Sequence, residues 1–278
     1  GAPRLRPVRR HLPRLAGMKR YRALLTGASG GIGRAIAAAL APHCAELVLV
    51  GRDAARLAQS AAAAGAVARI LVADLATAQG RDAVSLRGIN LLIHNAGAGD
   101  FAWLEHQSDA MLARIVETNL LAPMQLTRRL LPELARQPEA WIVNVGSIMG
   151  YLGYPGHAAY CASKFALRGF SEALRRELAD GPVRVLHLAP RATSTAMNGA
   201  GVCALNAELG VAMDDPALVA QELLALLRRP TRERLLGMPE AFFARLNQLM
   251  PGLVDRALRR QLPIIRRHAP ASPQEGIE

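Results

Sequence analysis

The sequence of 278 residues contains little cysteine, few aromatic side chains and no long apolar run. Three cysteines, Cys44, Cys161 and Cys203, are too few for a disulfide framework and lack the spacing of metal ligands. No apolar run reaches the roughly 18 residues that a membrane-spanning helix needs. These absences predict a reduced, cytoplasmic compartment, no metal, and one α/β domain long enough to bury a large core.

The positive charge lies mostly at the two ends of the chain. The formal net charge is +12, of which residues 1–17 contribute five arginines and residues 256–278 a net +3. Only +4 therefore remains for the rest of the chain. Aromatic residues do not alternate with the basic ones, and no nucleic-acid-binding motif is present. We therefore expect no nucleic-acid partner.

Three segments differ in composition. Residues 1–17 contain three prolines and no periodicity before Met18, and we interpret them as a disordered or non-native N-terminal segment. Residues 18–238 are predicted to form the folded α/β domain. Residues 239–278 are predicted to form an amphipathic helical extension.

Apolar, strand-like runs alternate with helical patterns from Lys19 onward. The predicted strands are Tyr21–Thr26, Glu46–Val50, Ala68–Val72, Leu91–His94, Trp141–Val145 and Arg184–Leu188, with Arg234–Met238 as a candidate last strand. The predicted helices lie near residues 31–41, 54–64, 109–136 and 158–179. Continuous apolar strands separated by helices indicate a doubly wound, Rossmann-type parallel sheet of about seven strands, with helices on both faces. The ligand of such a fold binds at the carboxyl ends of the strands.

A glycine-rich turn follows the first predicted strand, in the sequence TGASGGIG. Its glycines allow a tight turn, a close approach to a phosphate and close packing of helix on strand. The helix that they open presents free N–H groups and its positive dipole end to a pyrophosphate. The predicted phosphate-binding residues are Gly27, Ser29, Gly30, Gly31, Ile32 and Gly33.

The residue after the second strand bears on the choice of cofactor. NAD enzymes usually place an acid there, to accept a hydrogen bond from the ribose 2′-hydroxyl. This chain has Gly51 and then Arg52, whose guanidinium suits a 2′-phosphate, whereas Asp53 is predicted to be a helix N-cap. Arg34 either assists Arg52 or is an ordinary exposed helix residue. The pattern predicts NADP(H).

Two further turns follow predicted strands. Asp74 and Leu75 follow the third strand, where a short acid can accept a hydrogen bond from the adenine amine. Asn95, Ala96 and Gly97 form a small-residue turn after the fourth strand, against which the cofactor can lie. Each turn taken alone could equally be ordinary loop chemistry.

Tyr160 and Lys164 are four residues apart and hence on one face of a predicted helix. A nearby ammonium, together with the positive charge of an oxidised nicotinamide, is expected to favour the phenolate and lower the pKa of the phenol, which would make Tyr160 an acid/base. The alternative is a surface Tyr and Lys at common helical spacing. Only two lysines stand among 32 arginines, which favours a specific need for an ammonium at Lys164.

Ser147 and Asn119 are the remaining polar candidates. Ser147 follows the fifth strand, where its hydroxyl can hydrogen-bond both the substrate oxygen and the phenol. Asn119 lies in the long predicted helix before that strand. Its amide either satisfies backbone groups or holds a water that connects Lys164 to solvent.

These motifs, in this order and spacing, resemble the short-chain dehydrogenase/reductase family over roughly residues 19–200. The resemblance implies hydride transfer with Tyr160 as acid/base and Lys164 as ribose ligand and modulator of the phenol. It also implies Ser147 as the group that polarises the substrate and Asn119 as part of a proton relay. By the same resemblance Pro190, Thr193 and Thr195 lie at the cofactor, although Arg191 stands where the family usually has glycine.

The segment 196–215 corresponds in this family to a mobile lid over the substrate. Met197, Val202, Leu205 and Leu209 would then face an apolar substrate, or they pack on the core. Tyr151, Tyr154 and His157, between Ser147 and Tyr160, are further candidates for the substrate pocket.

The C-terminal residues depart most from the family. Phe242, Phe243, Leu246, Leu249 and Met250 fall on one side at helical spacing, and arginines flank the apolar positions that follow Pro251. This extension could contact an anionic membrane surface, cap the substrate pocket or cover the edge of the sheet. The chain is expected to form a homo-oligomer, a dimer or tetramer.

The sequence therefore predicts an NADPH-dependent reductase of a small-molecule ketone or, in reverse, an alcohol dehydrogenase. An apolar lid favours a keto-acyl or keto-lipid substrate. The alternatives are an epimerase or dehydratase on the same fold, a non-catalytic NADP-binding redox sensor, and a membrane-surface lipid-handling protein.

Overall fold

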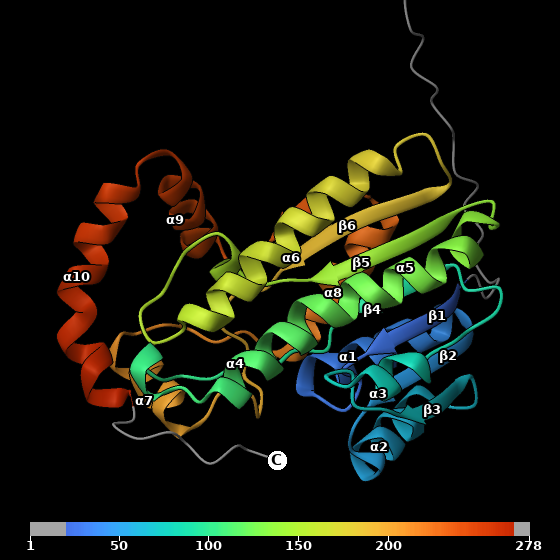
Figure 1. Cartoon of the computed structure of the whole chain (residues 1–278), viewed down its shortest axis with the longest axis horizontal. Helices are drawn as coiled ribbons and strands as arrows, with labels where there is room; N and C mark the ends of the chain where they lie inside the picture. The colour runs from blue at the N-terminus through green and yellow to red at the C-terminus, as the bar shows by residue number, and fades with distance from the viewer. Residues whose placement is uncertain (1–20, 270–278) are drawn as a thin grey trace, which may run out of the picture.

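The structure is a computed structural model that describes residues 21–269 (Figure 1). The predicted segment 1–17 and Met18 lie outside the described residues. Seven parallel strands form one sheet in the order β3-β2-β1-β4-β5-β6-β7. The strands are β1 Tyr21–Thr26, β2 Cys44–Gly51, β3 Ala68–Val72, β4 Leu91–His94, β5 Ala140–Val145, β6 Val183–Ala189 and β7 Glu233–Leu235. The predicted doubly wound parallel sheet is confirmed.

The last strand was predicted at Arg234–Met238 but occupies Glu233–Leu235. Gly237 has a φ of +84°, which ends the extended run, and Met238 already begins the next helix. The prediction was displaced because an apolar run does not show where the backbone turns.

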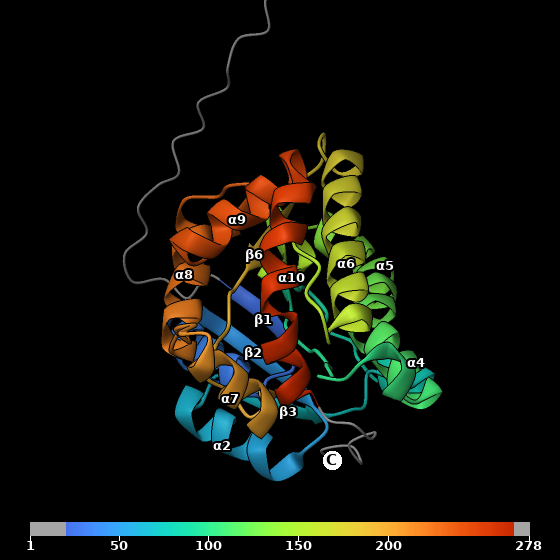
Figure 2. The ribbon, with the colours of Figure 1, turned by 90° about the vertical axis from the view of Figure 1, so that its left-hand side faces the viewer.

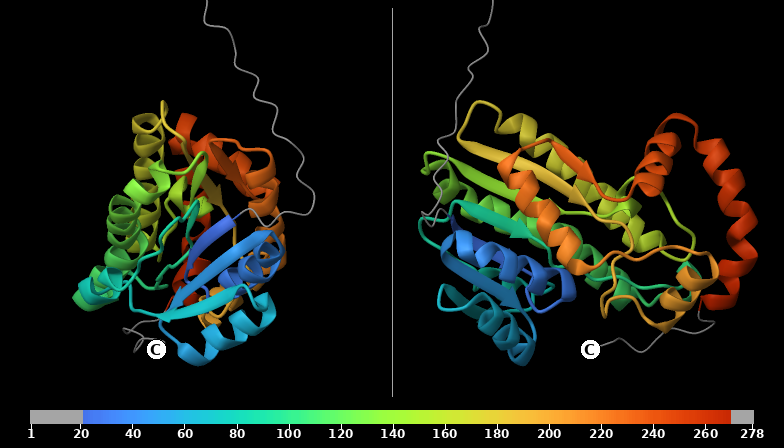
Figure 3. Two further views of the ribbon diagram at one scale, coloured as in Figure 1. Left: turned by 90° about the vertical axis from the view of Figure 1, so that its right-hand side faces the viewer. Right: turned by 180° about the vertical axis from the view of Figure 1, so that it is seen from behind.

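Helices cover both faces of the sheet, as the left-hand view of Figure 3 shows. Leucines of α1 and α8 pack with β1 and β2 in one core, and leucines of α5 and α6 pack with β4 and β5 in the other. The helices are α1 Gly31–Leu40, α2 Ala54–Ala64, α3 Ala78–Asp82, α4 Asp109–Val116, α5 Ala122–Ala135, α6 Ala158–Glu177, α7 Ala200–Glu208, α8 Pro216–Arg228, α9 Met238–Leu249 and α10 Pro251–His268. Every residue of β4 and β5 is buried, because both faces are covered.

The long helix predicted at 109–136 contains a π-helical turn at Glu117–Leu121, between α4 and α5. Pro123 has no N–H to donate to the carbonyl of Asn119, four residues earlier, so the regular hydrogen-bond pattern is broken there. π-Helical turns within helices occur often at functional sites. This one holds Asn119, whose side chain is fully buried.

Two helices follow β7 and lie beyond the carboxyl ends of the strands (Figures 1 and 2). We call α9 and α10 together the C-terminal hairpin, residues 238–268. Ile265 of α10 packs with Leu205 of α7 and with Phe101, so the hairpin is joined to the segment that was predicted to be a lid. Within residues 21–269, no helix is long and apolar enough to cross a membrane.

Candidate active site

The glycine-rich turn between β1 and α1 leaves no room for side chains at two positions. Gly27 has a φ of +65°, and a Cβ there would lie 2.6 Å from the Cα of Ala96. A Cβ on Gly33 would lie 2.1 Å from the carbonyl oxygen of Gly27. The turn is therefore tight, and α1 starts directly from it with unpaired N–H groups.

The side chains around this turn are arranged in a way that suits a pyrophosphate. Thr195, on the loop after β6, approaches Gly31 so closely that a Cβ there would lie 2.9 Å from the Thr195 methyl carbon. The Ser29 hydroxyl reaches toward Gly51 at the end of β2, 2.9 Å from where a Cβ would stand. Gly30 and Ile32 belong to the same turn and to the first turn of α1. Helix N–H groups, the Ser29 hydroxyl and the Thr195 side chain thus surround a crowded turn built from glycines, which fits a dinucleotide phosphate.

Arg52 is exposed at the carboxyl end of β2 and makes no hydrogen bond or ion pair with another described residue. Asp53 is the N-cap of α2, as predicted, and its carboxylate accepts from the Arg56 N–H at 2.9 Å. Arg34 donates to Gln59 at 3.0 Å. Arg52 is thus a guanidinium whose hydrogen-bonding capacity is available beside the glycine-rich turn.

The turns after β3 and β4 use their polar side chains within the protein. The Asp74 carboxylate accepts from Ala76 N–H at 3.0 Å, and Arg114 lies 3.4 Å from its other oxygen. Asn95 donates to the carbonyl oxygens of Thr26 and Gly27, at 3.2 and 3.1 Å, which ties β4 to the glycine-rich turn. Leu75 is buried in the core. The side chains of Asn95 and Leu75 therefore contact the protein itself, and their predicted contact with a cofactor stays a prediction.

The four predicted catalytic residues meet at the carboxyl ends of β4 and β5. Tyr160 and Lys164 occupy successive turns of α6, with the Lys164 ammonium 5.6 Å from the phenol ring centre. Lys164 is buried and donates to the Val145 carbonyl at 3.2 Å. Ser147 follows β5 directly, and its side chain interacts with the Tyr160 phenol and lowers the phenol pKa. The reacting hydroxyls are therefore positioned by a strand end and a helix that pack together.

Asn119 fastens the loop that faces this group. Its amide oxygen accepts from Ala98 N–H at 2.7 Å, and its amide nitrogen donates to the Ala98 carbonyl at 2.8 Å and to Ser163 Oγ at 2.9 Å. A Cβ on Gly97 would lie 3.5 Å from the Asn119 amide oxygen and 3.8 Å from the Lys164 ammonium. In this structure the Asn119 side chain hydrogen-bonds the backbone of Ala98 and the Ser163 hydroxyl. Gly97 lies close to both the Asn119 amide and the Lys164 ammonium.

Burial governs the protonation of the two candidate catalytic groups, Tyr160 and Lys164. It raises the pKa of Tyr160 to about 12, although the Ser147 hydrogen bond lowers it, and it lowers the pKa of Lys164 to about 8. The predicted lowering of the phenol pKa includes the charge of an oxidised nicotinamide and stays a prediction, whereas in the protein alone burial raises this pKa. Loss of hydration disfavours the phenolate more strongly than its neighbours favour it.

Aromatic rings surround the open side of Tyr160. His157 stacks on Phe101 with ring centres 5.0 Å apart, and it lies 6.2 Å from Tyr154 and 6.4 Å from Tyr160. Burial lowers the pKa of His157 to about 4, so its ring is neutral near pH 7. Met197 is half-exposed, and its methyl carbon would lie 3.6 Å from a Cβ on Gly97. Tyr154, His157 and Met197 thus stand where a substrate would meet the phenol.

Phe101 was missed in the sequence. It follows the NAG turn by only a few residues, but an isolated aromatic in a loop shows no periodicity. Its position in the chain, after the fourth strand of a doubly wound fold, was the one signal available.

Tyr151 was predicted to line the substrate pocket, and the structure contradicts this. The side chain is fully buried, and its hydroxyl donates to Glu233 on β7 at 2.9 Å. Arg168 lies over its ring at 4.0 Å. Burial raises the pKa of Tyr151. Tyr151 supports the short helical turn after Ser147 from the side away from Tyr160.

The apolar residues of the predicted lid pack within the protein. Leu205 is buried with Phe101 and Ile265, and Val202 and Leu209 pack against the same cluster. Of the two alternatives from the sequence, the structure favours packing for these three side chains. Met197 is the one that remains half-exposed.

Arg191 joins three segments after β6. Its guanidinium contacts Asp214 at 2.7 and 3.0 Å and Glu240 of α9 at 3.2 Å. The neighbouring Thr193 pairs with Asp214 through its backbone, and its hydroxyl donates to the Arg191 carbonyl at 2.9 Å. The Pro190 carbonyl accepts from Ile148 N–H at 2.9 Å, beside Ser147. The side chain that replaces the usual glycine therefore connects the cofactor loop to the C-terminal hairpin.

We expect Arg191→Ala to lower the free energy of unfolding by about 2–3 kcal/mol, because it leaves the buried Asp214 carboxylate without its cation. Urea unfolding measures this. Arg245→Ala, which removes a half-exposed ion pair with Glu233, is the matched control and should cost less than about 1 kcal/mol. Equal losses in the two variants would contradict a special role for Arg191.

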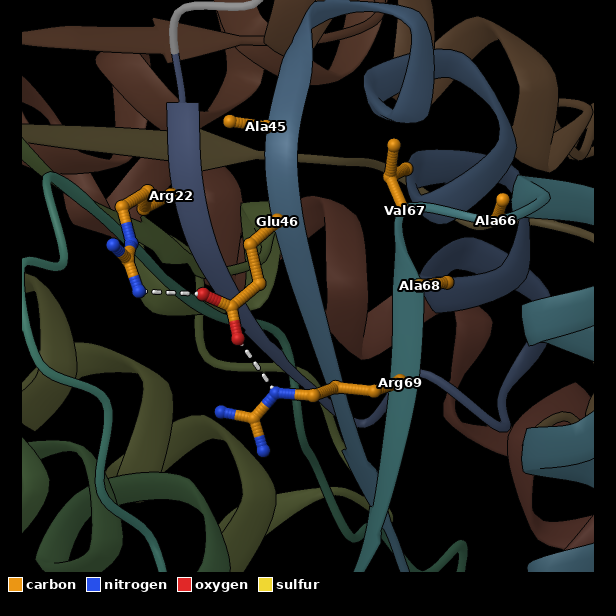
Figure 4. Close-up of a pocket in the computed structure, with 7 residues that line it drawn as sticks. All are labelled: Arg22, Ala45, Glu46, Ala66, Val67, Ala68 and Arg69. Atoms are coloured by element: carbon orange, nitrogen blue, oxygen red, sulfur yellow. Dashed lines mark hydrogen bonds and ion pairs between the residues drawn. The ribbon is translucent and has the colours of Figure 1, made fainter.

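A hollow lies at the end of the sheet opposite the candidate active site and is shown in Figure 4. Glu46 is held there between Arg22 at 2.7 Å and Arg69 at 2.6 Å. The hydrogen bond from Arg69 and the charge of both guanidiniums lower the pKa of Glu46. This hollow lies at the amino ends of β1 and β2, away from the edge at which a doubly wound sheet binds its ligand.

Comparisons with known proteins agree with this geometry. The family model described as short chain dehydrogenase matches residues 21–202. "Nodulation protein G" of Rhizobium sp. (strain N33) is 37% identical over 182 residues, which are 63% of this chain and 74% of that protein. A short-chain dehydrogenase from Sphingobium yanoikuyae, solved with NADPH, has a TM-score of 0.70 at 27% identity and covers 84% of this chain and 94% of its own. The 3-ketoacyl-(acyl-carrier-protein) reductase from Brucella melitensis, solved with NADH, has a TM-score of 0.68 at 29% identity and covers 77% and 94%.

Proposed function

The chain belongs to the short-chain dehydrogenase/reductase family, and on that premise we propose that it is an NADP(H)-dependent reductase of ketones with apolar substituents, such as keto-acyl or keto-lipid compounds. The observation that carries the proposal is the pair of hydroxyls on Ser147 and Tyr160, which interact at the carboxyl edge of the sheet so that Ser147 lowers the phenol pKa. Lys164 is buried beside the pair. NADPH, when bound, supplies the hydride that the carbonyl carbon accepts.

The chain's own residues handle the oxygen of the carbonyl. Ser147 donates a hydrogen bond that orients and polarises this oxygen, and Tyr160 donates the proton that turns it into a hydroxyl. The raised phenol pKa, about 12, keeps Tyr160 protonated near pH 7, which is the form that reduction requires. Oxidation of an alcohol would need the phenolate, which burial disfavours.

The predicted substrate side supports an apolar ligand. Phe101 and a neutral His157 form a stacked pair beside Tyr160, and Met197 adds a thioether. A charged substrate group would find no counter-ion among these side chains. A protein of the same fold is named 3-ketoacyl-(acyl-carrier-protein) reductase, and this name agrees with the proposed keto-acyl class of substrate.

The cofactor choice rests on Arg52, and calorimetric titration with NADPH and NADH tests it. We expect Arg52→Ala to weaken NADPH binding by about 10- to 100-fold, because a charge-assisted hydrogen bond contributes about 1.5–3 kcal/mol, while NADH binding stays unchanged. Arg56→Ala is the matched control, since Arg56 pairs with Asp53 on the same helix. Equal affinity of the unmodified protein for both cofactors would contradict the NADP assignment.

We also propose that the chain forms a homo-oligomer, a dimer or tetramer. Exposed apolar side chains on α4, α5 and α6 support this: Val116, Met124 and Phe165. Light scattering on the eluting protein measures the mass, and a monomer at micromolar concentration would contradict the proposal.

A further inference from the structure

Helix α9 presents its apolar side to solvent. Met238, Phe242 and Leu249 are spaced i, i+4 and i+11 and share one side of the helix. Their exposed fractions are 83%, 62% and 82%. Phe243 and Met250 widen the same face and are also exposed, at 46% and 52%. An amphipathic helix on a protein surface normally buries its apolar side. In α9 the apolar side faces solvent instead.

Polar contacts hold α9 in this orientation. Asn247 donates a hydrogen bond to the Tyr151 carbonyl at 2.9 Å, and the Glu240 carboxylate forms an ion pair with Arg191 at 3.2 Å. Ala244, on the same side, is fully buried against the domain. Turning α9 to bury its phenylalanines would break these contacts, so the outward apolar face is a fixed feature of the hairpin. We call Met238, Phe242, Phe243, Leu249 and Met250 the apolar face.

Helix α10 presents an arginine face. Its arginines are spaced i, i+3, i+4, i+10 and i+11 and therefore lie on one side, opposite the buried Val254 and Ile265. They are Arg256, Arg259, Arg260, Arg266 and Arg267, all exposed. Arg267 pairs with Glu208, and Arg266 lies over the Trp103 ring at 5.5 Å. The three nearer the α9 end of the helix, Arg256, Arg259 and Arg260, are the arginine group of the hairpin.

We propose that the C-terminal hairpin docks this protein on an anionic lipid bilayer, with the apolar face of α9 at the boundary of headgroups and acyl chains and the arginine group on the headgroups. Both helices lie at the same end of the molecule (Figure 2). Exposed apolar area and exposed arginines on one hairpin are the two features that binding in the plane of an anionic interface requires. No helix within residues 21–269 can cross the bilayer, so the contact is with its surface.

The charge of the hairpin separates this partner from a second copy of the chain. A twofold interface brings the same patch of both copies together. Two arginine groups would then face and repel one another. Asp255 is the one acidic residue of α10 that could offset this repulsion. An anionic headgroup layer instead complements all of the arginines. The inference concerns a surface beyond the catalytic site and does not depend on the reaction proposed above.

Co-sedimentation of the full chain with lipid vesicles tests the proposal. We expect binding to vesicles that contain phosphatidylglycerol, weak binding to pure phosphatidylcholine vesicles, and weaker binding in high salt, because screening shortens the range of the arginine charges. Arg256→Gln with Arg259→Gln and Arg260→Gln should weaken partitioning by about 100-fold, since each arginine near an anionic surface contributes about fivefold. The matched control changes three exposed arginines elsewhere, Arg228, Arg229 and Arg232, to glutamine.

A second pair of variants tests the apolar face. Phe242→Asp with Leu249→Asp should lower partitioning at least about tenfold, because both side chains leave the interface and two anions enter it. Leu218→Asp, at an exposed leucine of α8, is its control and should bind as the unmodified protein does. Thermal unfolding of each variant distinguishes a hairpin that no longer folds from one that no longer binds the vesicle. Substitutions at exposed positions should leave the midpoint of unfolding unchanged.

Equal binding to neutral and anionic vesicles, or no binding to either, would overturn the proposal. So would vesicle binding that survives both sets of hairpin substitutions. If Phe242→Asp with Leu249→Asp instead halves the mass in light scattering while vesicle binding is absent, the occupant of the apolar face is a second copy and the lipid proposal is wrong.

Discussion

Replacing Tyr160 by phenylalanine is expected to lower kcat for ketone reduction by about 10²- to 10⁴-fold, which is the usual contribution of a positioned acid/base. The ring of Tyr160 packs against Gly99, where a Cβ would lie 3.2 Å from it, and phenylalanine preserves that packing. The loss should therefore come from the missing proton donor alone. NADPH oxidation in the presence of an apolar ketone measures it by absorbance.

NADPH affinity, measured by calorimetry, should change little in Tyr160→Phe. Tyr21→Phe is the matched control, because Tyr21 begins β1 at the far end of the sheet, and its kcat should equal that of the unmodified protein. If Tyr160→Phe retains full activity, the acid/base assignment is wrong. If the unmodified protein binds NADPH but reduces no ketone in a broad screen, a redox sensor becomes the better hypothesis.

Replacing Lys164 by methionine is expected to abolish turnover and yet stabilise the cofactor-free protein. Burial lowers the pKa of Lys164 from 10.5 to about 8, so the folded protein holds this ammonium at a free-energy cost of about 3 kcal/mol near pH 7. Methionine removes that cost but leaves the Val145 carbonyl without its donor, which gives back about 1 kcal/mol. The free energy of unfolding should rise by about 2 kcal/mol and Tm by several degrees.

The dependence on pH identifies the ammonium as the cause. Between about pH 8 and pH 10.5 the unfolded chain binds a proton at Lys164 that the folded chain has released, so this group makes stability rise with pH in that window. Below pH 8 both states carry the proton and the cost is fully present, and above pH 10.5 neither does. The stability difference between Lys164→Met and the unmodified protein should shrink across this window, measured by urea unfolding at fixed pH.

Lys164→Arg provides the control, because a guanidinium stays charged through this pH range. It should be less stable than Lys164→Met at every pH and should lack the rise between pH 8 and 10.5. A methionine variant that is less stable than the unmodified protein at pH 7 would show that the contacts of Lys164 outweigh its loss of hydration, contrary to the prediction.

Local features of the chain could be predicted well from sequence. The bounds of β1, β3, β4 and α2 match the prediction to the residue, because apolar runs, glycine and the Asp53 cap act over a few neighbouring positions. The order of elements then specified a doubly wound sheet, since parallel strands need helical crossovers. Ser147, Tyr160 and Lys164 could be placed together because strand ends of a parallel sheet share one edge.

The features that could not be predicted from sequence depend on contacts between distant residues. Tyr151 lies between Ser147 and Tyr160 in the chain, yet its hydroxyl pairs with Glu233, more than 80 positions later. Arg191 could be noticed as an unusual side chain, but its partners Asp214 and Glu240 are set by how the hairpin packs. The pKa of Tyr160 depends on the surrounding protein, which excludes water from the phenol. The spacing of residues along a helix does not show this burial.

The sequence by itself therefore determined the sheet, the glycine-rich turn and the identity of the candidate catalytic side chains, because each is encoded by residues close together in the chain. It also showed that α9 has an apolar side. Only the tertiary structure decided that this side faces outward, since Asn247 and Glu240 bind the domain from the opposite side of the helix. Which face of a helix is buried is a property of its neighbours, and these are brought together by the fold.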